Sequence, residues 1–258
     1  MELRQCILTN NDCYRTGRKI TPTGIMVHST GANNTDLKRY VQPDDGYLGV
    51  NSNANDWNRP GLDVCVHAFI GRDKNGDVAV YQTLPWDHRG WHAGGDANNS
   101  HISFEICEDG LQDAGYFSAV YEVSAQLCAM LCREYGIDPM AGIICHSEGH
   151  DMGLASNHAD VMHWFPIHGK SMDLFRERVQ ELLEDEEEEE MLTYEQFAEY
   201  MDKWLAEQNA RTEPNWSAGE GHWKAAVDAG IINDGRPEGF VKRDEMIAVL
   251  GRIGMLEQ

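Results

Sequence analysis

The sequence predicts an α/β domain followed by a smaller all-helical segment, and two observations support that prediction. Short apolar and β-branched segments alternate with longer segments of helical periodicity in the first part of the chain. An unbroken acidic run over 184–190 then separates this part from a remainder with helical patterns only. We therefore expect a first domain over 1–183, a solvated linker or frayed helix end over 184–191, and a helical domain over 192–258.

Five segments of the first domain have the length and composition of strands. Two of them flank "RDKNGD", whose Asn-Gly pair is typical of a tight hairpin. Helical patterns cover 117–135 and run from Ser171, a candidate capping residue, into the acidic run. The expected strands are Gly24–His28, Val64–Ile70, Val78–Thr83, Ile102–Cys107 and Gly142–Cys145.

Composition excludes several classes of partner. The formal net charge of −22 argues against nucleic acid, because phosphate binding needs a basic surface. It also argues against adhesion to anionic surfaces by charge alone. No apolar run is long enough to span a bilayer, so no membrane partner is expected. The start "MELRQCILTNNDC" lacks the features of a secretory signal, so we expect synthesis in a cytoplasm.

The seven cysteines are scattered along the chain without a CxxC pair. Several fall within expected strands or a helix, where a thiol behaves as a small hydrophobic group. We therefore expect mostly reduced core cysteines and no disulfide framework.

The segment after the acidic run begins with an amphipathic pattern, "TYEQFAEYMDKWLAEQ". It places Phe197, Met201, Trp204 and Leu205 on one helical stripe. The segment is small for a self-sufficient core, so we expect it to pack on itself, on the first domain or on a second copy.

Two histidines follow short apolar segments and suggest a metal site. His28 follows "GIMV" and His146 follows "GIIC", so both are expected at strand ends, where they can share a metal. His158, Asp160 and His163 lie downstream and offer nitrogen and carboxylate ligands of the kind that zinc takes. The alternatives are a strand-end histidine bonded to a carbonyl and a merely polar loop.

A carboxylate and a loop add to this pattern. Glu105 lies inside an apolar strand, on the face shared with Ser103 and Cys107, so it must meet solvent, an ion partner or an active site. The loop "RGWHAGG" over 89–95 suits the wall of a cleft, although a packed turn with a satisfied histidine would have the same pattern.

Four ordered stretches carry a resemblance to a known family. They are "GIMVHSTG", "VHAFIGRDKNGDVAVYQTLPWDHRGWHAGG", "NNSHISFEICEDG" and "ICHSEGH" with "NHADVMHWFP", which together cover most of 20–168. The chain closely resembles the zinc-dependent type-2 N-acetylmuramoyl-L-alanine amidases, whose fold is shared with peptidoglycan recognition proteins. The resemblance implies a mixed central sheet flanked by helices, a zinc ion (Zn²⁺) at one end, and bacterial peptidoglycan as the partner.

The resemblance also implies a ligand set for the metal. His28 and His146 match the two zinc histidines of the family, and Asp160 matches its third ligand. The stretch between His146 and Asp160 is longer than usual, so His150 or His158 could compete with Asp160 as a ligand.

The implied reaction is hydrolysis of the amide between the lactyl group of muramic acid and L-alanine. Glu105 matches the catalytic glutamate, which acts as general base. His158 stands where many members have a lysine, and in protonated form it would help to stabilise the oxyanion. His67 suits either a cleft wall or a bond to a metal ligand. The expected substrate-binding residues are Trp91, His92, Asn99 and His67.

The biological setting has several interpretations. A wall-degrading domain without a secretion signal suggests a phage or prophage endolysin released at lysis, with an exported bacterial autolysin as the alternative. A non-catalytic peptidoglycan receptor and a muropeptide-recycling amidase are the competing functions.

The C-terminal segment weakly resembles a surface-layer-homology-like repeat, so it can bind the wall or form homo-oligomers. The run "EEEEEM" can be encoded as a ribosome-binding sequence, in which case Met191 would start a separate copy of 191–258. The alternative is a plain acidic linker with an incidental methionine.

Overall fold

The computed structural model describes residues 1–190, 194–209, 224–225 and 228–229. The chain divides into two compact units, Met1–Glu188 and Glu189–Gln258. None of the helices in these described ranges combines the length and apolarity needed to cross a bilayer. The proposed start at Met191 lies outside the described residues. So does the expected repeat-like segment beyond 209, apart from residues 224–225 and 228–229.

A six-stranded mixed sheet forms the centre of the first unit, in the order β1-β4-β3-β5-β2-β6. β3 and β4 pair antiparallel through the expected Asn-Gly hairpin, whereas the other strand pairs are parallel. The mixed α/β fold expected from the sequence is therefore confirmed. The strands are β1 (Leu3–Gln5), β2 (Gly24–Asn33), β3 (Ala68–Arg72), β4 (Val78–Gln82), β5 (His101–Glu108) and β6 (Ile143–Cys145).

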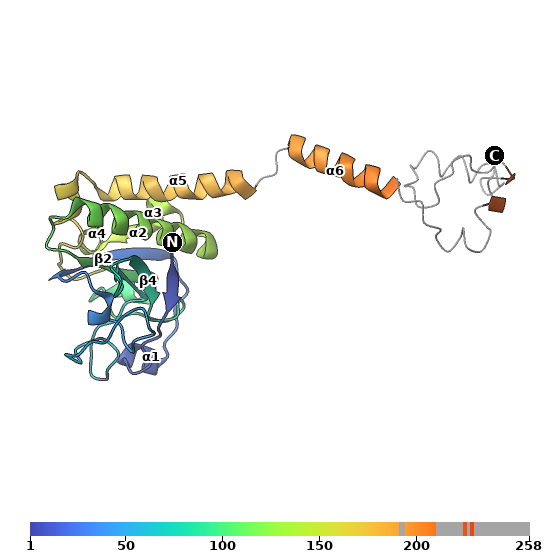
Figure 1. Ribbon diagram of the computed structural model, residues 1–258. Coiled ribbons are helices and arrows are strands. Elements are labelled where there is room, and N and C mark those ends of the chain that lie inside the picture. The colour runs from blue at the N-terminus through green and yellow to red at the C-terminus, as the bar shows by residue number, and fades with distance from the viewer. Residues whose placement is uncertain (191–193, 210–223, 226–227, 230–258) are drawn as a thin grey trace. The chain divides into compact units, whose positions relative to one another are not determined.

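Helices α2 (Ala114–Tyr135) and α5 (Met172–Glu190) lie alongside each other over one face of this sheet (Figure 1). Alternate strand residues such as Ile25 and Val27 point into this layer and are fully buried against apolar side chains of both helices. α5 continues as a helix through the acidic run to Glu190, where the sequence suggested a linker or a frayed helix end. This layer is the main hydrophobic core, and it leaves the opposite sheet face for the polar side chains described below.

A buried arginine joins α5 to the segment that carries His146. The Arg176 side chain donates to the carboxylate of Glu148 and to the carbonyl oxygen of Ile143. Glu148 in turn accepts from the backbone N–H of Cys145, which caps helix α4 (His146–Asp151). These contacts fix the junction between β6 and α4, which is the point where His146 leaves the sheet.

The opposite face of the sheet is covered in part by the loop after β2. Tyr40 stacks on Phe69 of β3, and Trp57 packs edge-on against the same ring. The expected strand over 64–70 begins only at Ala68, because Cys65 pairs with Trp91 in an isolated bridge and leaves the sheet.

The cysteine prediction is wrong at one pair. Cys13 and Cys65 form a disulfide across a sequence separation of 52 residues. The fold brings the short helix α1 (Asp12–Thr16) against the Cys65 bridge, a contact that no local sequence pattern signals. Consistent with the prediction, the remaining cysteines are free, and four of them are buried.

Short elements and one further helix complete the described structure. α6 (Tyr194–Asn209) confirms the amphipathic pattern after the acidic run, although Phe197 and Trp204 of its apolar stripe are exposed in the structure. The short elements are η1 (Leu37–Arg39), η2 (Asp96–Asn99), α3 (Pro139–Gly142) and η3 (Phe165–His168).

Candidate metal centre

His28 lies in the middle of β2 and not at the strand end that the sequence suggested. The strand continues to Asn33, but its register with β5 shifts between Ser29 and Asn33. Regular pairing therefore ends at Ser29, one residue after His28, which explains the mistaken boundary. Alternation places the His28 side chain on the face opposite α2, where it is only 1% exposed.

Three side chains converge on this face from distant parts of the chain. The Nδ1 atom of His28 lies 3.1 Å from Nδ1 of His146 and 3.3 Å from Oδ2 of Asp160. Nδ1 of His146 lies 3.4 Å from the same carboxylate oxygen. Among the described residues, these three form the cluster whose ligand atoms could hold a metal ion.

The spacing of these atoms fits zinc. Zn–N and Zn–O bonds of about 2.1 Å in a tetrahedral site place neighbouring ligand atoms about 3.3 to 3.4 Å apart. The observed separations of 3.1, 3.3 and 3.4 Å therefore approximate one face of such a tetrahedron. A water or substrate oxygen could take the fourth position, as in catalytic zinc sites.

The charge states of the cluster also suit a cation. Burial lowers the pKa of His28, so its imidazole is neutral at neutral pH. Burial tends to raise the pKa of Asp160, but hydrogen bonds to His146 and His28 outweigh this effect and lower it well below its usual range. The cluster therefore offers two imidazole nitrogens and an ionised carboxylate, a donor set typical of zinc and other divalent transition metals.

Each metal-facing histidine is held by a second contact through its other ring nitrogen. Nε2 of His28 lies 3.0 Å from Nδ1 of His92, and Nε2 of His146 lies 3.2 Å from the Ser156 hydroxyl. The same hydroxyl is 3.1 Å from the carbonyl oxygen of Ala93. His92 is thus placed beside a metal-facing histidine, whereas the sequence suggested a cleft residue that binds substrate.

The loop over 92–95 is fixed by its neighbours. The side-chain oxygen of Asn98 accepts from the backbone N–H groups of His92 and Ala93, at 2.8 and 2.9 Å. A Cβ atom at Gly95 would collide with the Leu154 carbonyl oxygen, so glycine permits this close approach of the two segments. Asn98 and Ser156 were not predicted as site residues, because short polar residues in loops carry no periodic signal.

Glu105 lies beside His28 on the adjacent strand. The two residues are register partners of β5 and β2, so their side chains share one sheet face. The Oε2 atom of Glu105 is buried and has no hydrogen-bond partner among the residues that the structure describes. Burial raises the pKa of Glu105 well above its usual value, and the charges of Asp160 and Glu108 add to this effect. A carboxylate with these properties is suited to accepting a proton near neutral pH.

The other histidines of the 146–163 segment have different surroundings. His158 is exposed, its ring lies 4.6 Å from that of His146, and its Nδ1 atom is 3.0 Å from the Ser156 hydroxyl. His150 is exposed, with Nδ1 3.4 Å from the Ala155 carbonyl oxygen. His163 pairs with Glu108 at 2.9 Å. None of the three belongs to the described metal cluster, whose carboxylate is that of Asp160.

His67 is fully buried and is bonded to no metal ligand, so it takes neither of the two placements expected from the sequence. Its Nε2–H donates to the His88 carbonyl oxygen at 2.8 Å, and its Nδ1 accepts from the Ser103 backbone N–H at 3.0 Å. Both ring nitrogens are thereby engaged within the chain, and neither is bonded to a member of the metal cluster. Burial lowers the pKa of His67 to about 4, so the ring is neutral.

The two remaining expected substrate residues lie at different depths. Trp91 is half-buried and packs with the Cys13–Cys65 pair, while its backbone bridges Cys65. Asn99 is exposed, and its side-chain oxygen accepts from Arg89 at 2.7 Å. The neighbouring Asn98, and not Asn99, supports the loop beside the metal cluster.

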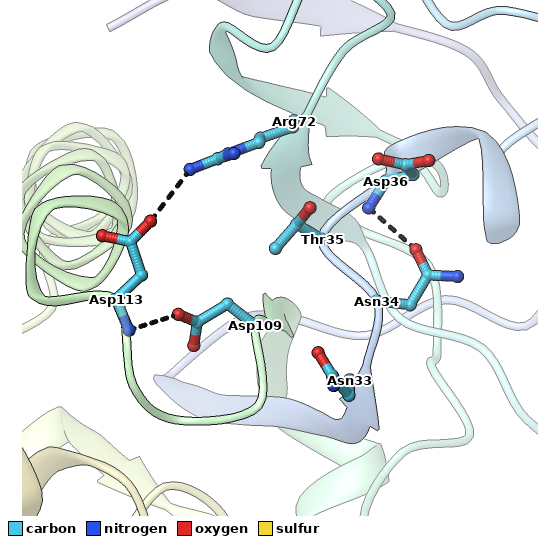
Figure 2. Close-up of a pocket in the computed structure, with 7 residues that line it drawn as sticks. All are labelled: Asn33, Asn34, Thr35, Asp36, Arg72, Asp109 and Asp113. Carbon is cyan, nitrogen blue, oxygen red and sulfur yellow. Dashed lines mark hydrogen bonds and ion pairs between the residues drawn. The ribbon is translucent and has the colours of Figure 1, made fainter.

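A separate polar pocket of about 370 Å³ lies at the ends of β2, β3 and β5 (Figure 2). The Arg72 guanidinium extends to the Asp113 carboxylate, at 3.4 Å, and Asp109 accepts from the Asp113 backbone N–H at 2.7 Å. Its arginine is therefore paired within the pocket, which shares no residue with the metal cluster. The lining residues are Asn33, Asn34, Thr35, Asp36, Arg72, Asp109 and Asp113.

The sheet carries a His-His-Asp cluster with a half-buried glutamate beside it. These features place the protein in the class of α/β proteins with a candidate catalytic metal centre. The family model described as N-acetylmuramoyl-L-alanine amidase matches residues 17–162, which include the three cluster residues and Glu105. The chain belongs to this family, which confirms the resemblance found in the sequence.

Individual relatives are similar over part of the chain. The N-acetylmuramoyl-L-alanine amidase CwlH of Bacillus subtilis (strain 168) is 30% identical over 115 residues, which are 40% of this chain and 44% of CwlH. The chain thus matches less than half the length of this relative. A mutant structure of PlyL has a TM-score of 0.50 at 18% identity and covers 70% of this chain and 99% of its own, which supports the shared fold. The catalytic domain of XlyA has a TM-score of 0.48 at 22% identity, over 69% of this chain and 99% of its own.

Proposed function

We propose that this chain is a zinc-dependent hydrolase of bacterial peptidoglycan that cleaves the amide bond between N-acetylmuramic acid and L-alanine. The observation that carries the proposal is the triangle of ligand atoms from His28, His146 and Asp160, with Glu105 beside it on the next strand. All four residues lie within the range matched by the amidase family.

A zinc ion held by His28, His146 and Asp160 supplies Lewis-acid activation of water and of the scissile carbonyl. Glu105 takes a proton from the attacking water as the new carbon–oxygen bond forms. It then returns that proton to the amine of L-alanine as the carbon–nitrogen bond breaks. The raised pKa of Glu105 suits both steps, because the group must accept and release a proton within one cycle.

His158 is proposed to assist at the carbonyl oxygen. Ser156 lies 3.0 Å from its Nδ1, so Nε2 is the ring atom that can reach a substrate. A hydrogen bond from Nε2–H would stabilise negative charge on the carbonyl oxygen in the transition state. The exposed position of His158 beside the His146 ring is compatible with that role.

The test of the proposal is digestion of purified cell walls followed by mass spectrometry of the released fragments. Amidase activity predicts stem peptides with a free L-alanine amine and glycan strands with intact lactyl carboxyl groups. A chelator should abolish the release, and added zinc should restore it. Fragments cleaved at a glycosidic bond or within the stem peptide would contradict the proposal.

The two alternative functions predict different results in the same assay. A non-catalytic peptidoglycan receptor would bind walls and release nothing, with or without metal. A muropeptide-recycling amidase would cleave soluble fragments and leave the turbidity of intact walls unchanged. The half-buried Glu105, whose buried Oε2 atom has no hydrogen-bond partner among the described residues, favours catalysis over the receptor, because binding alone does not require a proton acceptor beside the metal cluster.

We further propose that the chain acts as a phage or prophage endolysin, made in the host cytoplasm and reaching the wall at lysis. The segment after the acidic run is proposed to supply wall binding or self-association. Comparing wall binding and oligomeric state of the full chain with a variant that ends at residue 188 would test this part of the proposal separately.

A further inference from the structure

His28 has contacts on both ring nitrogens, and the two contacts differ in kind. Nδ1 faces the cluster, 3.1 Å from His146 and 3.3 Å from Asp160. Nε2 lies 3.0 Å from Nδ1 of His92, with the two rings edge to face at 77°. A neutral imidazole carries one ring proton, either on Nδ1 or on Nε2. The nitrogen that carries this proton is the only one through which His28 can donate a hydrogen bond.

Without a metal, the proton of His28 is best placed on Nδ1, where it can be donated to the Asp160 carboxylate. Nε2 is then an acceptor, and His92 must donate from its own Nδ1–H. A metal bound at Nδ1 of His28 requires that atom to be unprotonated. The proton then resides on Nε2 and is donated to His92, whose Nδ1 must be unprotonated and whose Nε2 must carry the proton.

We propose that His92 is a positioning residue that fixes the metal-binding tautomer of His28 by accepting its Nε2–H. This proposal rests on the proposed metal site, because it concerns the tautomer in which His28 can bind the metal. His92 touches no ligand atom of the cluster, so it acts through His28. In metal sites, such outer partners orient the ligand ring and raise its basicity.

The surroundings of His92 hold the acceptor in place. Asn98 binds its backbone N–H, and Gly90 leaves just enough room for the ring, because a Cβ atom at Gly90 would lie 2.9 Å from Cδ2 of His92. The Nε2 atom of His92 is buried and has no hydrogen-bond partner within the described part of the chain. An apolar ring of similar size would avoid that unbonded nitrogen, so packing alone gives a poor account of an imidazole here.

Metal affinity provides the first test, measured by zinc competition with a chromophoric chelator on the full chain. His92→Phe keeps the ring and removes the acceptor, and it should weaken zinc binding about 10- to 100-fold. His92→Gln can restore an acceptor through its side-chain oxygen and should recover part of that loss. His150→Phe is the matched control on an exposed histidine outside the cluster, and it should leave the affinity unchanged.

The tautomer of His92 provides a second test by nitrogen-15 NMR of the imidazole groups. Adding zinc should move the His92 proton from Nδ1 to Nε2, which a purely structural role would not do. An unchanged His92 tautomer together with wild-type zinc affinity of His92→Phe would overturn the proposal. His28→Ala separates this outcome from failure of the metal site itself: if that variant also binds zinc normally, the site assignment is wrong.

Discussion

His28 and Glu105 are register partners on neighbouring parallel strands, so a metal-facing imidazole and a half-buried carboxylate share one face of the sheet. Neighbouring strands lie about 4.8 Å apart, which places the two side chains side by side without any loop between them. The distance between the proposed proton acceptor and the proposed metal is therefore set by backbone hydrogen bonds and not by flexible segments.

Replacing Glu105 by Gln should preserve the fold and zinc binding but abolish most turnover. The amide is similar in size to the carboxylate but cannot accept a proton, and loss of a general base typically costs about 10²- to 10⁴-fold in rate. The measurements are kcat on a defined muropeptide and zinc content of the purified variant. Glu134→Gln, on the exposed side of α2, is the control. A turnover close to wild type would exclude Glu105 as the base.

Replacing Asp160 by Ala should sharply lower zinc occupancy, and so should His28→Ala. Each change removes one of three ligand atoms that lie 3.1 to 3.4 Å apart. His158→Ala should retain zinc and lose part of the turnover, because His158 lies outside the cluster. Metal analysis of the three purified variants checks this set. If His158→Ala lost zinc while Asp160→Ala kept it, the ligand assignment would have to be exchanged.

The stability of the protein should fall as the pH drops from about 6.5 towards 4, with His67 as one cause. Burial lowers the pKa of His67 to about 4, whereas an unfolded histidine titrates near 6.5. Between these values the unfolded chain binds a proton that the folded chain does not, so the free energy of unfolding decreases. The contribution lost over this window is about 3 kcal/mol.

Chemical denaturation at several pH values tests the histidine prediction. His67→Gln can keep both hydrogen bonds, to the Ser103 N–H and to the His88 carbonyl oxygen, but it does not titrate. Its free energy of unfolding should therefore depend less on pH between 4 and 6.5 than that of the wild type. Equal pH dependence in the two proteins would contradict the role given to His67.

Removing the Cys13–Cys65 disulfide should lower the free energy of unfolding by about 4 kcal/mol, as the loop-entropy account gives for a separation of 52 residues. Cys13→Ser combined with Cys65→Ser, compared with wild type under oxidising and reducing conditions, measures this contribution. Reducing agent should destabilise the wild type and leave the double variant unchanged. Cys6→Ser, which removes a free thiol, is the control.

Local sequence patterns were sufficient for most of the longer elements and for much of the site, whereas β1, α1 and α4 were not predicted. Apolar runs marked four strands to within a few residues, and the Asn-Gly pair marked the β3–β4 turn. The histidine after "GIMV" and the glutamate inside "ISFEIC" stood out because polar groups are costly in apolar strands. These signals are visible in sequence because side-chain alternation and turn chemistry depend on residues close together in the chain.

The tertiary structure decided how those residues meet. His28 lies 118 residues from His146 and 132 from Asp160. The pairing of β2 with β6 places His146 beside His28, and the loop after α4 brings Asp160 to both. The same holds for the contact of His92 with His28 and for the Cys13–Cys65 disulfide, which the sequence did not indicate. Such contacts depend on which strands and loops pack side by side. This packing is determined by the burial of apolar surface over the whole core, so no local sequence pattern specifies it.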